Sequence, residues 1–313
     1  MKCLVSGATG FIGRHLCQRL LERGDTVVAL SKSGATLECG APTLALDLSQ
    51  AMPGSESLQG VDVVFHLAGI AHQQAAQAAY TTLNENATLQ LARQCSAAGV
   101  ARFIFLSSTK AMGPSNSSGE RSEQECIPPT DTYGLSKWRA EQALRTEFAD
   151  DPMAVVILRP ALVYGGSAKG NLALLAKGVA AGLPRPPVHG ARSMVAVADL
   201  VELLCIVARE PVQPIQTWIV TDGQHYSTRF VYDQLRQAVG KGVGAAWLPT
   251  AGWRLAATLL DCRPGRSHET TWDKLFGIEL YSNRAVLEAT SWRPRYRLEH
   301  LARGIMAAGA PTQ

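Results

Sequence analysis

The first 160 residues alternate short, β-branched apolar runs with longer segments of helical periodicity. The apolar runs are nearly continuous, as in strands that are covered on both faces. Strict alternation of this kind predicts an α/β fold with a doubly wound parallel sheet. Strands are expected at Lys2–Ser6, Thr26–Leu30, Pro42–Leu46, Val61–His66, Arg102–Ser107 and Ala154–Arg159, and helices at Phe11–Arg23, Ala75–Ala98 and Leu135–Ala149.

The pattern loosens after Pro160, where loops rich in Gly and Pro separate shorter helices. We expect a sheet-based domain over residues 1–164 and a smaller mixed lobe over 165–313. Residues 193–222 are expected to return to the first domain, because they contain a helical pattern at Asp199–Arg209 and an apolar run at Thr217–Thr221.

Composition excludes several classes of protein. The 313 residues are 46% hydrophobic and 18% charged, which is typical of a globular chain, and the net charge of +4 gives no reason to expect nucleic acid or an anionic membrane. Seven cysteines without a C-x-x-C pair argue against a disulfide framework and against a metal site. The stretch 253–260 is too short to span a membrane, and no N-terminal signal is visible, so a soluble, cytoplasmic protein is expected.

Three glycines, Gly7, Gly10 and Gly13, lie in "SGATGFIG" between the first strand and the first helix. In that context Gly7 permits a tight turn, Gly10 lets the backbone approach a pyrophosphate, and Gly13 lets helix and strand pack closely. The N–H groups of the helix start would then face the phosphates. The sequence thus predicts a Rossmann dinucleotide site. The alternative is a strand–helix turn in which the glycines serve only the backbone.

The end of the second strand bears on the choice of coenzyme. An acid there would hold a ribose 2′-hydroxyl, whereas a cation would accept a 2′-phosphate. The sequence offers Ser31, Lys32 and Ser33 and no carboxylate. We therefore expect NADP(H) to be preferred, with NAD(H) as the alternative, since a single lysine is also a common surface residue.

Tyr133 and Lys137 are four residues apart in "TDTYGLSKW" and fall on one side of a helix that Asp131 or Thr132 could cap. An ammonium group beside a phenol favours the phenolate, so we expect Lys137 to lower the pKa of Tyr133. Such a tyrosine can exchange a proton with a hydroxyl or ketone. Ser108, after the fifth strand, could hydrogen-bond the same oxygen. The alternative is that Tyr133 and Lys137 are ordinary exposed residues and that Ser108 is an ordinary turn residue.

Together the motifs resemble those of the extended short-chain dehydrogenase/reductases, in particular the NAD(P)-dependent sugar-nucleotide epimerase/dehydratase group. The likeness covers nearly the whole chain: "GATGFIG", "ALDLS", "VVFHLAG", Asn84, "SSTKAMG", "YGLSK" and "LRPALVYG" all have counterparts there. It implies that Ser108, Tyr133 and Lys137 are catalytic. It also implies, with the second strand, that the coenzyme contacts Gly7, Thr9, Gly10, Phe11, Ile12, Gly13, Ser31, Lys32, Asp47, Leu48, Leu67, Ala68, Gly69, Tyr133, Lys137 and Pro160.

In the second lobe the resemblance implies a nucleotide-sugar site. Asn171 and Arg192 match residues near the diphosphate, and Ser108 and Thr109 would contact the sugar. The family's 4,6-dehydratases carry Asp-Glu where this chain has Thr109 and Lys110, so a dehydratase is not expected. His72, Lys110 and Trp272 are further candidates for the sugar pocket, although each is an ordinary surface or packing residue too.

The resemblance implies hydride transfer at C4 of a UDP-sugar. A 4-keto-sugar reductase or dehydrogenase of bacterial polysaccharide biosynthesis is preferred, and a UDP-hexose 4-epimerase (for UDP-glucose or UDP-GlcNAc) with retained NAD is the alternative. A non-catalytic NADP(H)-binding protein is a third reading. Members of the family usually dimerise by packing the helices that follow strands 4 and 5 against those of a second subunit, so the resemblance implies a homodimer.

Overall fold

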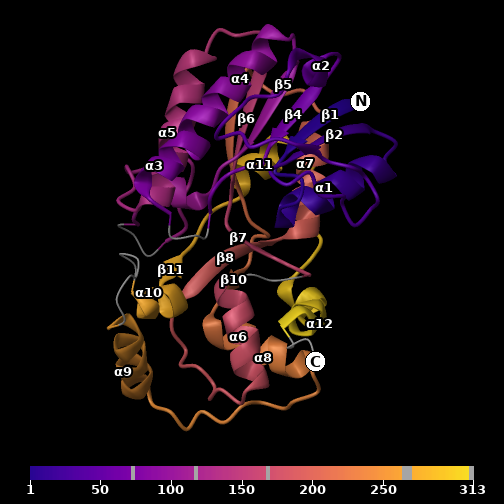
Figure 1. Ribbon diagram of the computed structural model, residues 1–313. Coiled ribbons are helices and arrows are strands. Elements are labelled where there is room, and N and C mark those ends of the chain that lie inside the picture. The colour runs from indigo at the N-terminus through magenta and orange to yellow at the C-terminus, as the bar shows by residue number, and fades with distance from the viewer. Residues whose placement is uncertain (72–74, 116–118, 167–169, 263–269, 310–313) are drawn as a thin grey trace.

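The larger part of the molecule is built on a parallel sheet with strand order β3-β2-β1-β4-β5-β6-β9 (Figure 1). In this computed structural model the described residues are 1–71, 75–115, 119–166, 170–262 and 270–309. The expected doubly wound parallel sheet is confirmed. Its strands are β1 (Lys2–Ser6), β2 (Thr26–Ser31), β3 (Leu44–Ala45), β4 (Val63–His66), β5 (Arg102–Leu106), β6 (Ala154–Pro160) and β9 (Ile215–Val220).

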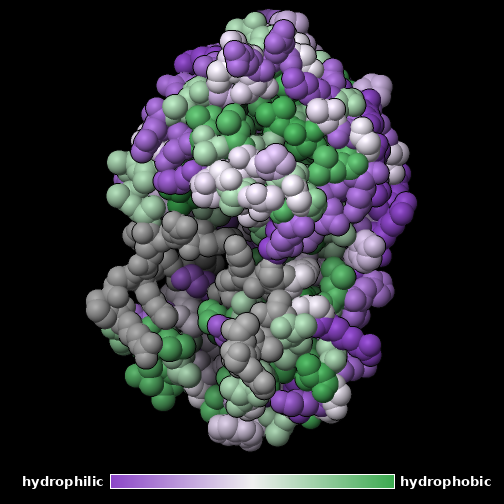
Figure 2. Space-filling model, turned by 45° about the vertical axis from the view of Figure 1, so that its right-hand side comes forward, coloured by the Kyte–Doolittle hydropathy of each residue, from purple (hydrophilic) through white to green (hydrophobic). Residues whose placement is uncertain are grey.

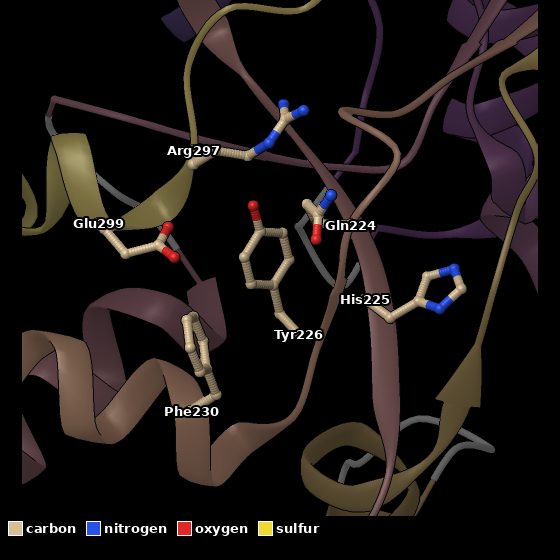
Figure 3. A pocket seen from close by; sticks show the side chains of 6 residues that line it. All are labelled: Gln224, His225, Tyr226, Phe230, Arg297 and Glu299. Atoms are coloured by element: carbon tan, nitrogen blue, oxygen red, sulfur yellow. The ribbon is translucent and has the colours of Figure 1, made fainter.

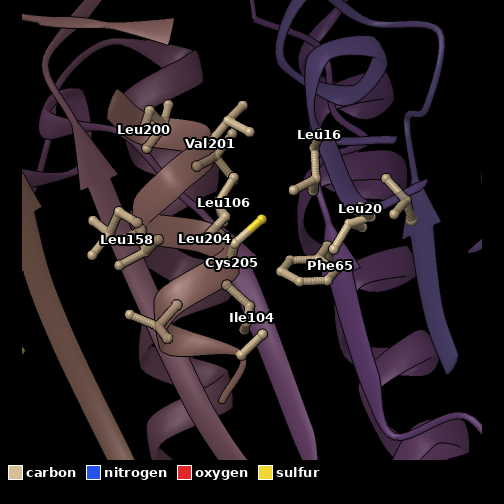
Figure 4. Packing of buried hydrophobic residues seen from close by; sticks show 14 of the residues in the cluster. Leu16, Leu20, Phe65, Ile104, Leu106, Leu158, Leu200, Val201, Leu204 and Cys205 are labelled. Carbon is tan, nitrogen blue, oxygen red and sulfur yellow. The ribbon is translucent and has the colours of Figure 1, made fainter. Parts of the chain in front are cut away.

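Helices cover both faces of this sheet, which explains why its strands are apolar throughout. On one face α1, α7 and α11 pack on the strands, and Figure 4 shows Leu16 and Leu20 of α1 facing Phe65 across this core. Burying each such leucine contributes about 1.5–3 kcal/mol. On the other face α2, α4 and α5 pack. The bounds are α1 (Phe11–Glu22), α2 (Ser55–Leu58), α4 (Ala87–Ala97), α5 (Thr132–Glu147), α7 (Val197–Val207) and α11 (Arg284–Ala289).

The segment expected as one helix over Ala75–Ala98 is divided. It consists of α3 (Gln77–Tyr80), a π-helical stretch η1 (Thr81–Asn86) and α4. The wider turn lies where the buried Asn84 reaches sideways: its side chain accepts from the Ile70 N–H at 2.9 Å and donates to the Ser136 hydroxyl at 3.0 Å. π-Helical turns are rare and occur mostly as local bulges inside α-helices, frequently at functional sites.

A smaller sheet lies below the first in Figure 1, with order β10-β8-β11 and β7 paired to β8. Strands β7 and β11 run parallel to β8, whereas β10 runs antiparallel to it. Helices α6, α8 and α12 form an apolar core against this sheet. The bounds are β7 (Leu162–Tyr164), β8 (Ala191–Ala196), β10 (His225–Tyr226), β11 (Ile278–Glu279), α6 (Gly170–Ala180), α8 (Thr228–Ala238), α9 (Thr250–Asp261), α10 (Thr271–Phe276) and α12 (Leu298–Gly309).

The chain crosses between the two parts more than once. After β8 in the small sheet, α7 and β9 return to the large sheet, where Leu158 of β6 pairs with Trp218 of β9. One face of the molecule, seen in Figure 2, carries hydrophilic residues over much of the upper part, with hydrophobic groups between them. Among the described residues no helix combines the length and the apolar character needed to cross a membrane.

Candidate functional site

The glycine turn between β1 and α1 has the geometry expected from its sequence. Gly7 has φ +71°, and a Cβ there would lie 2.8 Å from the main-chain nitrogen of Ala68. A Cβ at Gly13 would overlap the Gly7 carbonyl oxygen. The tight turn and the close packing of helix on strand therefore both depend on the missing side chains.

The start of α1 is suited to a phosphate. Its N-cap is Gly10, which provides no side-chain cap, so the N–H groups of the first turn can donate to an anion. The neighbouring Thr9 is exposed, and Phe11 and Ile12 are half-buried. A dinucleotide pyrophosphate fits this turn, since Gly7 and Gly10 have no side chains and the first N–H groups of α1 have no side-chain cap.

The end of β2 is arranged differently from the expectation. Ser31 is buried, and its hydroxyl lies 2.6 Å from the Thr43 hydroxyl and accepts from Gly34 N–H at 3.0 Å. Lys32 is 82% exposed, with Nζ 2.8 Å from Asp47 Oδ2. The bond to Lys32 lowers the pKa of Asp47 to about 2. The expected phosphate cation thus already has an anionic partner.

Helix α5 presents the candidate tyrosine at its first turn. Asp131 is the N-cap, and its carboxylate accepts from the Gly134 N–H at 2.8 Å. The helix therefore begins at Thr132, three residues before the apolar pattern indicated, and Tyr133 lies in its first turn. The Ser108 side chain forms a hydrogen bond with the Tyr133 phenol. Ser108 caps the 3₁₀ turn η2 (Thr109–Met112) that follows β5, so its position is fixed too.

Lys137 is buried one turn further along α5. Its Nζ donates to Leu106 O at 2.9 Å and lies 4.5 Å from the centre of the Phe105 ring. A Cβ on Gly69 would come within 3.3 Å of that nitrogen. The ammonium group is thereby held between the ends of β4 and β5. Serine, tyrosine and lysine converge at the carboxyl edge of the sheet, the edge where such folds bind ligands.

The electrostatics of Tyr133 differ from the expectation. Burial raises the pKa of Tyr133 to about 12, and the hydrogen bond from Ser108 and the charge of Lys110 only partly offset that rise. Burial also lowers the pKa of Lys137 to about 8, with Glu141 opposing that shift. The expected lowering of the tyrosine pKa is therefore wrong for the protein chain by itself, because desolvation outweighs the Ser108 hydrogen bond and the charge of Lys110.

A buried ion pair lies beneath these groups. Arg159 and Glu141 are 2% and 0% exposed, with Arg159 Nη2 2.5 Å from Glu141 Oε2. Ser107 donates to the same carboxylate at 2.5 Å. This pair fastens α5 to β6, and Pro160 ends β6 at the same edge of the sheet. The spacing of Glu141, four residues after Lys137, is a signal that the sequence contained but that sequence reasoning did not use.

The remaining predicted coenzyme residues lie at strand ends or beside them. Leu67, Ala68 and Gly69 follow β4, and Leu67 and Ala68 are half-buried whereas Gly69 is exposed. Leu48, after β3, is 5% exposed and packs into the core beneath α4. Thr109, which was predicted to contact the sugar and not the coenzyme, is 6% exposed at the start of η2.

In the smaller lobe Arg192 lies on β8 and is clasped by neighbours. Its Nη1 lies 3.2 Å from Glu279 Oε2, and its Nη2 donates to Asp273 O at 2.5 Å. Its Nε is buried without a hydrogen-bond partner among the described residues. The Asn171 side chain and all of His72 lie outside the described residues, so their predicted roles stay predictions.

A cavity of about 370 Å³ opens in the smaller lobe. In Figure 3 Gln224 and Glu299 flank the Tyr226 ring, and Arg297 lies beyond its hydroxyl. None of the site residues predicted from the sequence lines this cavity, whose remaining residues are His225 and Phe230. It is separate from the serine, tyrosine and lysine described above.

Most of the chain matches a known family of proteins. The model of the NAD dependent epimerase/dehydratase family matches residues 3–220. That range includes the glycine turn, Ser108, Tyr133 and Lys137. The chain belongs to the NAD-dependent epimerase/dehydratase family. The expected resemblance to this family is confirmed, and the protein is accordingly an enzyme of a nicotinamide-dependent class.

Curated relatives of this epimerase/dehydratase family member have different activities. It is 31% identical over 312 residues to a UDP-glucose 4-epimerase of Vibrio cholerae, a match covering 95% of this chain and 92% of the relative. It is 27% identical over 252 residues to a 2-alkyl-3-oxoalkanoate reductase of Stenotrophomonas maltophilia, covering 77% and 76%. A solved structure, MoeE5 in complex with UDP-glucose and NAD, has a TM-score of 0.78 at 23% identity and 98% coverage of both chains. That likeness supports the fold.

Two residues near the site were missed from the sequence. Glu279 lies on the two-residue strand β11 and reaches both Lys110 and Arg192. Tyr281 follows it, is 6% exposed, and has a hydrogen bond with the Thr109 side chain. Neither residue stands in a local pattern, because their approach to η2 depends on how the two parts of the chain meet.

Proposed function

We propose that this protein transfers a hydride between NADP(H) and C4 of a UDP-sugar, as a 4-keto-sugar reductase or dehydrogenase of bacterial polysaccharide biosynthesis. The observation that carries the proposal is the convergence of Ser108, Tyr133 and Lys137 at the carboxyl edge of the sheet, beside the glycine turn. Family membership supports the nicotinamide dependence, and the curated Vibrio relative supports the UDP-sugar.

In the reductive direction the nicotinamide, when bound, supplies the hydride. Tyr133 then gives its proton to the oxygen at C4. A phenol with a pKa of about 12 is protonated at neutral pH, which is the form that this step needs. Ser108 donates a hydrogen bond to the same oxygen as it gains charge, a contribution of a few kcal/mol in a closed site. Lys137, held at the end of β5, would bind the nicotinamide ribose and would provide positive charge on that side of the site.

We assign the diphosphate to Arg192 and the Asn171 side chain, and the sugar to Ser108 and Thr109. The buried Nε of Arg192, which has no partner among the residues that the structure describes, supports this assignment, since an anion would supply the missing acceptor. An arginine is suited to diphosphate because its planar fork can donate two parallel hydrogen bonds. The homodimer is proposed through α4 and α5, which an Arg93–Glu147 ion pair joins side by side.

A UDP-hexose 4-epimerase with retained NAD is the second candidate. Two observations favour it: the Vibrio relative carries that name, and Lys32 is paired with Asp47, so the cation assigned to a 2′-phosphate has another partner. An epimerase oxidises and re-reduces C4 within one turnover and so keeps its coenzyme. A reductase must exchange its coenzyme every turnover.

One experiment separates the two. The purified protein is incubated with UDP-glucose and UDP-GlcNAc without added coenzyme, and the sugars are analysed by chromatography. The reductase proposal predicts no change, whereas 4-epimer formation would establish the second candidate. Mass spectrometry of nucleotides that co-purify with the protein then identifies the coenzyme. Light scattering tests the dimer, for which a monomer mass would be contrary evidence.

A further inference from the structure

Lys110 links the candidate catalytic residues to the smaller lobe. Its main-chain N–H donates to the Ser108 hydroxyl at 3.2 Å, and its charge acts on Tyr133. Its side chain makes an ion pair with the smaller lobe: Nζ lies 2.6 Å from Glu279 Oε1. Lys110 therefore stands beside the place where C4 of the sugar would react.

Glu279 in turn lies between Lys110 and Arg192. Its second carboxylate oxygen is 3.2 Å from Arg192 Nη1, and the two residues are directly paired in the register of β11 and β8. All three side chains are partly buried, with exposed fractions of 37%, 26% and 16% for Lys110, Glu279 and Arg192. Burial pushes the pKa of Glu279 upward, but the charges of Lys110 and Arg192 outweigh it and hold the pKa below its usual value. The carboxylate is therefore ionised at neutral pH.

Lys110, Glu279 and Arg192 form a row of charged side chains with Glu279 in the middle. Arg192 lies at the end assigned to the diphosphate, and Lys110 lies at the end assigned to C4. A sugar joined to the diphosphate must lie along the side chain between them, which is Glu279. A carboxylate in that position can accept hydrogen bonds from hydroxyl groups, and it repels a second carboxylate on the sugar.

We propose that Glu279 is a specificity-determining residue that selects neutral UDP-sugars over UDP-uronic acids. The inference rests on the proposed function, and it names the substrate class for that site. Glu279 neutralises the ammonium of Lys110, so the sugar end of the site offers no unpaired cation to a uronate. Because one carboxylate pairs with two cations, the three side chains together keep one net positive charge, which favours the diphosphate beside Arg192.

The test is a binding measurement by calorimetry with UDP, UDP-glucose and UDP-glucuronic acid. The wild-type protein is expected to bind UDP-glucose at least about tenfold more tightly than UDP-glucuronic acid. Glu279→Gln keeps the shape and removes the charge, and it should bring that ratio close to one. Lys110→Met removes one of the two cations that pair with Glu279 and should increase the ratio. Asp233→Asn is the matched control, since Asp233 pairs with Arg185 in the same lobe with the same 26% exposure, and it should leave the ratio unchanged.

Each result decides between the two claims. Equal wild-type affinity for both sugars, or an unchanged ratio in both Glu279→Gln and Lys110→Met, overturns the role of Glu279 while UDP binding still supports the proposed function. If one variant fails to fold, the other still gives a signed prediction. Absence of binding by all three nucleotides would overturn the proposed function and this inference with it.

Discussion

Lys137 Nζ donates a hydrogen bond of 2.9 Å to the main-chain oxygen of Leu106, the last residue of β5. This bond, together with the Phe105 ring 4.5 Å away, holds the ammonium group at the carboxyl edge of the sheet. The site is thus anchored to a buried strand of the large sheet. The charge of the Lys137 side chain depends on its burial, because burial lowers its pKa.

Reductive turnover is expected to decline as the pH rises through about 8. Burial lowers the pKa of Lys137 to about 8, so the side chain is charged below that pH and neutral above it. The positive charge near the reacting oxygen is then lost on the alkaline side. A pH–rate profile followed by NAD(P)H absorbance checks this. Lys137→Met should be slower and lack the decline near pH 8; an identical profile in both proteins contradicts the assignment.

Tyr133→Phe is expected to reduce turnover by about 10²–10⁴-fold while coenzyme affinity changes little, because the variant keeps the aromatic ring and lacks only the hydroxyl that gives the proton. Tyr296→Phe is the matched control, since that side chain is 41% exposed, and its rate should equal that of the wild type. Steady-state kinetics and fluorescence titration provide the two readouts. Full activity in Tyr133→Phe would support the reading as a non-catalytic coenzyme-binding protein.

Glu141→Gln is expected to destabilise the fold by about 3–5 kcal/mol, because it leaves the Arg159 charge buried without its anion. Urea unfolding measures the free energy. The double change Glu141→Gln with Arg159→Met should recover much of the loss, because it removes the unpaired charge. A single variant as stable as the wild type would show that the pair is not needed.

His66 is expected to make the fold less stable in acid. Burial lowers the pKa of His66 to about 3, with the Lys137 charge adding to that shift, whereas an unfolded histidine titrates near 6.5. Between those values the unfolded chain binds more protons, so the free energy of unfolding falls by about 1.4 kcal/mol per pH unit as the pH decreases. His66→Gln should have a shallower slope below pH 6.5. Equal slopes would contradict the prediction.

The proposed preference for NADP(H) rests on Lys32. Lys32→Ala is expected to weaken NADP⁺ binding by up to about fivefold relative to NAD⁺, since an exposed ion pair contributes at most about 1 kcal/mol. Asp47→Asn frees Lys32 and should change the ratio in the opposite direction. Calorimetry with both coenzymes measures it. Unchanged ratios in both variants would remove the basis for preferring NADP(H).

The amino-acid sequence by itself determined the large sheet and the three converging residues. Strands such as Arg102–Leu106 are apolar on both faces, and such a run can be recognised in the sequence without knowing which helices cover it. The roles of Gly7 and Gly13 were also predictable, because a turn with no room for Cβ atoms requires glycine at those positions. Tyr133 and Lys137 fall on one face of α5 by their spacing alone.

Tertiary structure alone decided the charges and the second half of the site. The pKa of Tyr133 is set by how deeply the assembled fold buries it, and no local spacing encodes that depth. Glu279 meets Lys110 although 169 positions separate them, through a strand of only two residues whose pairing depends on β8. Local sequence specifies periodicity and turns, whereas desolvation and contacts between distant segments arise only when the packed chain excludes water from them.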